Sequence, residues 1–270
     1  MLGLASSGGL PVSSQASGHA PAVTGGGYVT VRAPDLPTVA ALLAGPGADR
    51  SRAPDAAAAR TEVSTLEVRW IFPGELEPAV AAWFGRFPAR TESREDTYRV
   101  NPRERGLSVK IRGNGALEVK AYCGSQGILE VPGRARGHVQ AWHKWSFPAG
   151  LSRQGRDAPA EWRRVRKTRR LSRLALASDE MLAYDRELGQ APGCSAELTE
   201  IRTHGQNWWS LGFEATGPCP LLRGGLAAAA ALVFAEPVPA VRPGTDHFAS
   251  YLQWLARDPA GLSPGGAAEV

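Results

Sequence analysis

The sequence has few cysteines, no long apolar run and no sign of an export leader. Its 270 residues include three cysteines, and no two of them stand in a CxxC spacing. That pattern argues against a disulfide framework or a structural zinc site and favours a cytoplasmic or other reducing compartment. No segment approaches the ~20 apolar residues of a membrane span, so we expect no membrane partner. The weakly apolar start carries no positive region before it, which argues against a secretory signal.

The two ends of the chain lack the apolar and aromatic content of a folded domain. The first 60 residues are rich in Gly, Ala, Ser and Pro. Such a segment buries too little apolar surface to offset its conformational entropy, so we expect residues 1–60 to be mostly disordered, with a transient helix or a partner-binding segment over 30–43. We expect a flexible tail over 258–270. Residues 61–257 remain as one domain, large enough for a single core.

Several common catalytic and nucleotide-binding signatures are also absent. The sequence has no Walker A loop, no Rossmann fingerprint and no nucleophile elbow. The five histidines are scattered without the spacing of metal ligands, so we expect them to serve structure. Any chemistry that this chain performs must therefore be sought among its charged side chains.

Positive charge is concentrated in the middle of the chain. The whole sequence has a formal net charge of +5, whereas residues 86–173 hold 21 Lys or Arg against 8 Asp or Glu, a net of +13. The ends are therefore relatively acidic. Such a cluster of cations is costly unless a polyanion or facing carboxylates offset the repulsion.

Many of these cations recur at every second position of strand-like runs. Lys110 and Arg112 belong to one run, Lys120 to the next, and Lys167 and Arg169 to a third. Because successive side chains of a strand point to opposite faces, the cations of each run point the same way. Strands joined in a sheet would gather them on one surface suited to a phosphate-rich ligand. The solvated face of an antiparallel sheet shows the same alternation and is the alternative.

Turn signals and hydrophobic periodicity predict an α+β domain. Alternating runs predict strands over residues 64–72, 95–100, 106–113, 116–123, 138–147, 161–171, 195–203 and 208–216. Helical spacing predicts helices over 76–87, 221–235 and 247–257, and Gly and Pro predict a loop over 124–137. Asn114-Gly115 marks the clearest hairpin. The set predicts a large antiparallel sheet or barrel with flanking helices.

The order of the charged motifs resembles the CYTH-like superfamily, also called the triphosphate tunnel metalloenzymes. The resemblance covers about residues 62–217 and rests on Leu-Glu67-Val-Arg-Trp, Arg94-Glu-Asp-Thr-Tyr98, Val-Lys110-Ile-Arg112, Leu-Glu118-Val-Lys120, Val-Arg-Lys167-Thr-Arg169, Ala-Glu197-Leu-Thr-Glu-Ile and Leu-Gly-Phe-Glu214-Ala. It implies an antiparallel eight-stranded tunnel-like β-barrel with flanking helices, open at both ends. Activities in the superfamily include thiamine, inorganic and RNA triphosphate hydrolysis and class IV adenylate cyclisation.

The resemblance also implies roles for the charged side chains. Six cations would bind the phosphates of a triphosphate or polyphosphate small molecule: Arg69, Lys110, Arg112, Lys120, Lys167 and Arg169. Three acids would serve catalysis and hold Mg²⁺ or Mn²⁺: Glu67, Glu197 and Glu214. As an alternative, these acids neutralise the tunnel cations, and Arg69 belongs to a structural ion network.

The sequence departs from the superfamily pattern in its acids. Arg69 and Ile71 stand where the first strand of the superfamily has a second Glu and a Lys, and Thr199 stands where a later strand has Asp. The last acidic pair keeps only Glu214. A divalent cation needs several oxygen ligands, and an Arg beside its position repels it and attracts phosphate. The cations that would bind phosphate are therefore kept, whereas the acids that would bind a metal are reduced in number.

These features predict a basic tunnel that binds a triphosphate- or polyphosphate-containing ligand, with weak metal-assisted phosphohydrolase activity at most. One alternative is an active Mg²⁺- or Mn²⁺-dependent triphosphatase that acts on inorganic, thiamine or nucleoside triphosphates. A second is an RNA-binding basic domain that uses the run over residues 163–170, although nucleic acid is the less favoured partner because alternation turns Arg166 and Arg170 outward. The sequence does not indicate an oligomeric state.

Overall fold

The computed structural model describes residues 61–100, 106–147, 162–177, 180–183 and 192–257. The disordered segment predicted over 1–60, with its helix over 30–43, and the tail predicted over 258–270 lie outside the described residues. Within the described ranges, no helix is long and apolar enough to cross a membrane.

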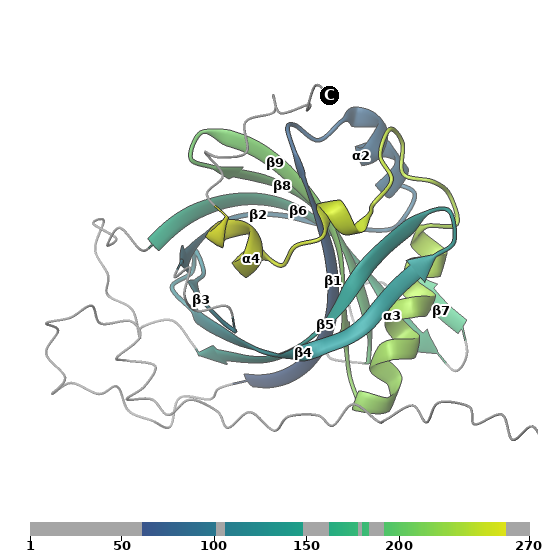
Figure 1. Ribbon diagram of the computed structural model, residues 1–270, viewed down its shortest axis with the longest axis horizontal. Coiled ribbons are helices and arrows are strands. Elements are labelled where there is room, and N and C mark those ends of the chain that lie inside the picture. Colours follow the sequence, from purple (N-terminus) through teal and green to yellow (C-terminus); the bar gives the residue numbers. More distant parts are fainter. Residues whose placement is uncertain (1–60, 101–105, 148–161, 178–179, 184–191, 258–270) are drawn as a thin grey trace, which may run out of the picture.

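The strands are β1 (Thr61–Pro73), β2 (Arg90–Arg99), β3 (Leu107–Ile111), β4 (Leu117–Val131), β5 (Ala135–Phe147), β6 (Trp162–Ala177), β7 (Glu180–Ala183), β8 (Gly193–Thr203) and β9 (Gln206–Thr216). They pair antiparallel in the order β2-β3-β4-β5-β1-β9-β8-β6, and β6 pairs with β2 to close the ring (Figure 1). β7, which was not predicted, pairs with the end of β6. The prediction of an α+β fold built on an antiparallel eight-stranded barrel is confirmed.

The helical elements are α2 (Pro78–Phe84), α3 (Cys219–Val233), the 3₁₀ turn η1 (Thr245–His247) and α4 (Tyr251–Ala256). The single helix predicted over 247–257 is therefore wrong in extent. The chain is extended at Phe248, which bridges to Trp70 of β1. Ser250 then caps α4, because its hydroxyl accepts from the backbone N–H of Gln253 at 3.2 Å while the Gln253 side chain accepts from the Ser250 N–H at 3.0 Å.

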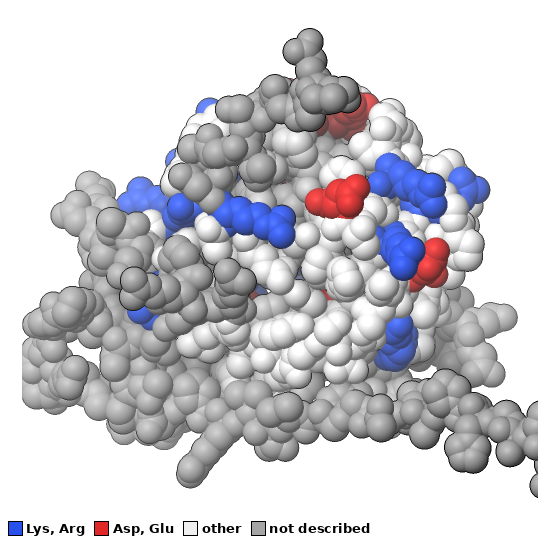
Figure 2. Space-filling view, in the orientation of Figure 1, with Lys and Arg blue, Asp and Glu red and all other residues white. Residues whose placement is uncertain are grey.

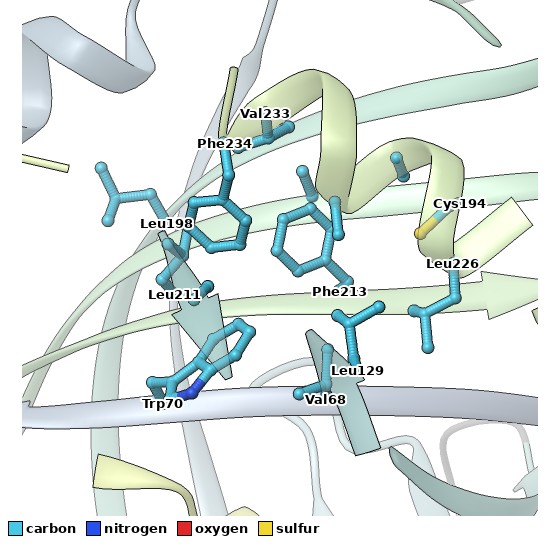
Figure 3. Close-up of a cluster of buried hydrophobic side chains, with 14 of the residues drawn as sticks. Val68, Trp70, Leu129, Cys194, Leu198, Leu211, Phe213, Leu226, Val233 and Phe234 are labelled. Carbon is cyan, nitrogen blue, oxygen red and sulfur yellow. The ribbon is translucent and has the colours of Figure 1, made fainter. Parts of the chain in front are cut away.

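The largest apolar core lies outside the barrel wall, between the wall and α3. Val68 and Trp70 of β1 are buried there with Phe213 of β9 and Leu226 of α3 (Figure 3). The Trp70 ring lies edge-on to that of Phe234, with centroids 5.7 Å apart. Because side chains alternate along a strand, the residues between these apolar positions face the barrel interior.

β4 continues through the segment predicted as a loop over 124–137, so that prediction is wrong. The strand runs to Val131 and turns at residues 132–134 into β5. Its pairing with β5 shifts register between Tyr122 and Gly124 and again between Ser125 and Ile128, and the φ angles of Gly124 and Gly127 there are 123° and 82°. Glycine adopts this backbone conformation without strain. The glycines therefore form bulges that bend the strand rather than end it.

α4 packs into one end of the barrel. Trp254 lies edge-on to Trp208 of β9 with ring centroids 5.5 Å apart, in a buried cluster that includes Ile71 of β1. The Arg163 guanidinium donates to the Leu255 carbonyl at 2.8 Å. The resemblance implies a tunnel that is open at both ends. In the structure α4 narrows one of these ends, and Figure 1 shows the helix at the rim of the ring of strands.

Candidate functional site

The barrel encloses a charged cavity of ≈ 340 Å³. Inward-facing positions of all eight ring strands line it, because they alternate with the apolar positions that pack outside. All nine residues selected from the sequence lie along this cavity: Glu67, Arg69, Lys110, Arg112, Lys120, Lys167, Arg169, Glu197 and Glu214. Their cations thus face a shared interior and not open water, whereas their roles in binding or catalysis stay predictions.

Sequence reasoning gave no role to seven other charged or aromatic residues that line the cavity: Glu92, Arg94, Tyr98, Glu118, Lys144, Arg173 and Tyr251. The signal for several was present. Arg94 and Tyr98 share one face of β2, and Lys144 lies opposite Lys120 across the β4–β5 pairing. Alternation followed along each whole strand would have found them. Tyr251 comes from α4, and no sequence pattern linked that helix to the barrel interior.

Cations outnumber acids in this interior. Among the described residues, nine Lys or Arg and five Glu line the cavity. Asp96 is completely buried beside it, with its carboxylate 3.2 Å from Nε of Arg94, 3.6 Å from Nζ of Lys167 and 3.8 Å from Nζ of Lys110. Nine cations against these six carboxylates leave an excess of three positive charges when all groups are ionised.

Arg69 crosses the interior from β1 to β8 and β9. Its Nη1 donates to Glu197 Oε1 at 2.9 Å and to Ser210 Oγ at 3.0 Å, and its Cζ lies 4.8 Å from the centre of the Tyr251 ring. Although burial by itself lowers the pKa of Arg69, the charge of Glu197 outweighs it and the pKa is raised. Gly212 lies opposite Arg69 in the β1–β9 pairing, and a Cβ there would sit 2.9 Å from Cζ of Arg69.

Glu197 connects two arginines. Its carboxylate accepts from Arg69, from Nη2 of Arg169 at 2.9 Å and from the Thr199 hydroxyl at 2.8 Å. Burial alone would raise the pKa of Glu197, but the positive charges of Arg69 and Arg169 hold it far below its usual range. Glu197 is therefore an ionised acid whose oxygens already have partners.

Glu67 and Glu214 face each other across the β1–β9 pairing and share a lysine. Lys120 Nζ donates to Glu67 Oε1 and lies 3.6 Å from Glu214 Oε1, and Lys144 Nζ donates to Glu214 Oε1 at 3.1 Å. Burial raises the pKa of Glu214, but Lys120 and Lys144 lower it to about 2. Burial lowers the pKa of Lys120, but Glu214 and Glu67 raise it above its usual value. Glu214 and Lys120 therefore stay charged at neutral pH.

Glu118 holds the cations of the β3 hairpin. Its carboxylate lies 2.7 Å from Nζ of Lys110 and pairs with the guanidinium of Arg112. Burial raises the pKa of Glu118, but Lys110 and the neighbouring cations lower it well below its usual range. Burial outweighs the acids around Lys110 and lowers the pKa of that lysine.

Lys167 is the most deeply buried cation of the site, with 2% of its side chain exposed. Its Nζ donates to the Tyr98 hydroxyl at 2.6 Å and lies 3.5 Å from the centre of the Tyr251 ring. Burial, followed by the charge of Lys110, lowers the pKa of Lys167 well below its usual value. The acids around this ammonium group do not compensate it fully.

The acids do not form a metal site in this arrangement. Among the residues that the structure describes, no three His, Cys, Asp or Glu side chains group so that they could hold a metal ion. Glu67, Glu197 and Glu214 each contact at least one protein cation. A divalent cation prefers several free oxygen ligands, so the residues as placed do not fit Mg²⁺ or Mn²⁺. We therefore derive no chemical step through a metal.

The cations of the basic run over residues 163–170 are divided between the two faces of β6. Two of its cations line the cavity. Outside, Arg166 pairs with Glu95 and Arg170 pairs with Glu200, both at 2.9 Å. On the face drawn in Figure 2, Lys and Arg lie in small separate groups with Asp and Glu among them. Arg166 and Arg170 thus have carboxylate partners, which weakens the case for an RNA-binding surface.

Comparison with known protein families finds no match, and neither does comparison with curated proteins. Solved structures give remote likenesses. The PH1819 protein from Pyrococcus horikoshii OT3 is 13% identical, with a TM-score of 0.36, over 72% of this chain and 98% of that chain. The Pct1 RNA triphosphatase of S. pombe is 9% identical, with a TM-score of 0.34, over 62% and 78%. The same enzyme in complex with the Spt5 CTD is 8% identical, with a TM-score of 0.34, over 62% and 79%. Likenesses this remote assign no family to the chain.

Proposed function

We propose that the barrel interior binds a small polyanion that carries a triphosphate or polyphosphate chain, as a divergent CYTH-like protein would. The observation that carries this proposal is the excess of three positive charges in a buried cavity of ≈ 340 Å³. Unbalanced charges inside a protein repel one another more strongly than charges in water. A bound polyanion would remove that repulsion, so the excess of positive charge favours such a ligand.

The chemistry of the cations supports phosphate over other anions. Arginine presents a planar fork of N–H donors that matches phosphate oxygens, and lysine adds a compact charge. The cavity offers both kinds from opposite walls, with Arg69 on β1, Lys110 on β3 and Arg169 on β6. An extended chain of phosphates can therefore be contacted from several sides at once.

We further propose that binding dominates over turnover. A hydrolase needs a carboxylate that is free to orient water or to hold a metal at the phosphate. Glu67, Glu197 and Glu214 are instead engaged by lysines and arginines. Metal-assisted triphosphatase activity with Mg²⁺ or Mn²⁺ is therefore only the second candidate. It would require the incoming ligand to displace a lysine and so free one of these acids. A reducing compartment stays a prediction that fits the three free cysteines.

The experiment measures binding and release side by side. The full chain is titrated calorimetrically with tripolyphosphate, thiamine triphosphate and ATP, and phosphate release is followed for the same ligands with Mg²⁺ or Mn²⁺. We expect binding of at least one ligand with little or no release. Lys120→Met, which removes an inward cation, should weaken binding by about 1–3 kcal/mol.

Arg166→Met is the matched control, because Arg166 is outward and 74% of its side chain is exposed. It should leave binding unchanged. No binding of any triphosphate would overturn the proposal. Rapid metal-stimulated release would establish the triphosphatase candidate in its place. Equal losses in both variants would point to a surface site for a polyanion such as RNA.

A further inference from the structure

In the part of the chain that the structure describes, each glutamate that lines the cavity already contacts a cation of the protein. The pairs described above account for Glu67, Glu118, Glu197 and Glu214. The remaining one, Glu92, lies 3.0 Å from Nη1 of Arg94 and 3.3 Å from Nη1 of Arg169. An incoming Mg²⁺ would have to enter among the lysines and arginines that line the cavity and displace one of them from its acid.

The guanidinium of Arg69 is held in one position inside the cavity. Its guanidinium is fixed by Glu197 and Ser210 and lies over the Tyr251 ring. Gly212 provides the space, since a side chain at that position would begin 2.9 Å from the guanidinium carbon. Arg69 and Gly212 are therefore complementary in shape, as expected for a cation with a fixed place in the cavity.

From this we infer that the barrel binds its polyphosphate as the metal-free anion. Arg69 supplies, as a permanent part of the wall, the positive charge that a divalent cation would otherwise bring with the ligand. This inference rests on the proposed function and adds to it the chemical form of the ligand. Because Mg²⁺ neutralises a triphosphate and the cavity is already positive, the magnesium complex should bind more weakly than the free anion.

The test compares tripolyphosphate binding by isothermal titration calorimetry in EDTA and in an excess of Mg²⁺. We expect binding in EDTA and an apparent affinity roughly ten-fold or more lower with Mg²⁺, because the complexed ligand has lost charge. Titration with Mn²⁺ alone should give no binding heat. The full chain is used throughout, and its thermal melt is recorded in each buffer.

Two variants test the part played by Arg69. Arg69→Gln should weaken binding in EDTA by roughly ten- to hundred-fold, the worth of one charge-assisted contact, and Mg²⁺ should then weaken it less than in the wild type. Gly212→Ala keeps every charge but moves the guanidinium, and it should weaken binding by roughly a few-fold. Arg166→Gln, on the outer surface, is the control and should behave as wild type. If Arg69→Gln does not fold, Gly212→Ala carries the test.

The outcomes separate this inference from the proposed function. Binding that requires Mg²⁺ or Mn²⁺ overturns the inference and leaves the polyphosphate-binding proposal in place. The absence of binding in both buffers overturns the proposed function and the inference with it. Metal-free binding that neither Arg69→Gln nor Gly212→Ala alters would show that Arg69 does not supply the charge, and would also overturn the inference.

Discussion

At the scale of single residues, we expect the protonation of Lys167 to depend on whether a phosphate is bound in the barrel. Burial and the nearby charge of Lys110 lower its pKa well below the usual value, and Asp96 and Glu197 compensate only in part. A phosphate brought beside Nζ would favour the protonated form. By linkage, a group that gains a proton when a ligand binds makes the binding pH-dependent.

The affinity for tripolyphosphate should therefore fall as pH rises. In the empty barrel Lys167 loses its proton at a pH well below its usual value, and the deprotonated lysine cannot attract phosphate. Calorimetry at a series of pH values should show that the affinity of the wild type falls with rising pH relative to that of Lys167→Met, a comparison that removes the effect of the ligand's own protonation. In buffers of different ionisation enthalpy it should also show proton uptake on binding. Lys167→Met should reduce this uptake, and an equal pH dependence of affinity in both proteins would contradict this assignment.

Arg169 and Arg166 offer a matched pair on the same strand. Arg169 faces the cavity and contacts Glu197 and Glu92, whereas Arg166 contacts Glu95 on the outer surface. Arg169→Ala should weaken tripolyphosphate binding by about 1–3 kcal/mol, the worth of a charge-assisted hydrogen bond. Arg166→Ala should change binding and stability by less than ~1 kcal/mol. The readout is the thermal shift with ligand, and equal loss in both variants would exclude the interior site.

The sequence revealed most charged residues of the site, because strand periodicity alone decides which side chains share a face. Lys167 and Arg169 could be placed together on that basis, and so could Lys110 and Arg112. The partner of each acid could not, because contacts such as that of Arg69 with Glu197 depend on how strands far apart in the chain pair across the barrel. The space that Gly212 leaves for Arg69 is likewise visible only once β1 and β9 lie side by side.

At the scale of elements, α3 stabilises the barrel from outside without contributing to the cavity. Leu226 is fully buried against the wall, whereas Leu232 on the same helix is 38% exposed. Leu226→Ala should destabilise the protein by about 2–5 kcal/mol, and Leu232→Ala by less than ~1 kcal/mol. Urea unfolding measures both. Calorimetry should show wild-type tripolyphosphate affinity for each folded variant, and a large loss of affinity in Leu226→Ala would contradict the separation of core and site.

Elements were predictable where periodicity was strong and failed where glycine or capping decided the outcome. The alternation of β1 and the Asn114-Gly115 hairpin indicated their strands correctly. Gly124 and Gly127 suggested a loop because glycine is common in turns, yet in β4 they form bulges. The position of α4 could not be predicted, because it depends on a contact between Trp254 and Trp208, which lie far apart in the chain.

At the scale of the whole molecule, the fold places its largest apolar core outside the barrel wall and a charged cavity inside it. Cations and acids lie side by side along the cavity. The acids therefore stabilise the folded protein by offsetting the repulsion between the cations, and they also line the candidate site. The pKa values of Asp96, Glu118, Glu197 and Glu214 are all lowered: burial opposes this, and the neighbouring cations outweigh it. Protonation of these acids would remove four of the six carboxylates that oppose the nine cations, and the barrel should then loosen.

The free energy of unfolding should therefore fall at acid pH. A carboxyl group whose pKa is lower in the folded state contributes stability above its unfolded pKa and loses it as pH falls toward the folded value. For Glu214 that window runs from its ordinary pKa of 4.5 down to about 2. Urea unfolding at decreasing pH should show the loss beginning below about pH 5.

Glu214→Gln should make the curve shallower and reduce stability at neutral pH by about 1–3 kcal/mol. Glu200→Gln, which removes an outward acid paired with Arg170, should leave the curve unchanged. If both variants followed the wild-type curve, the interior acids would not be the groups that hold the empty barrel together.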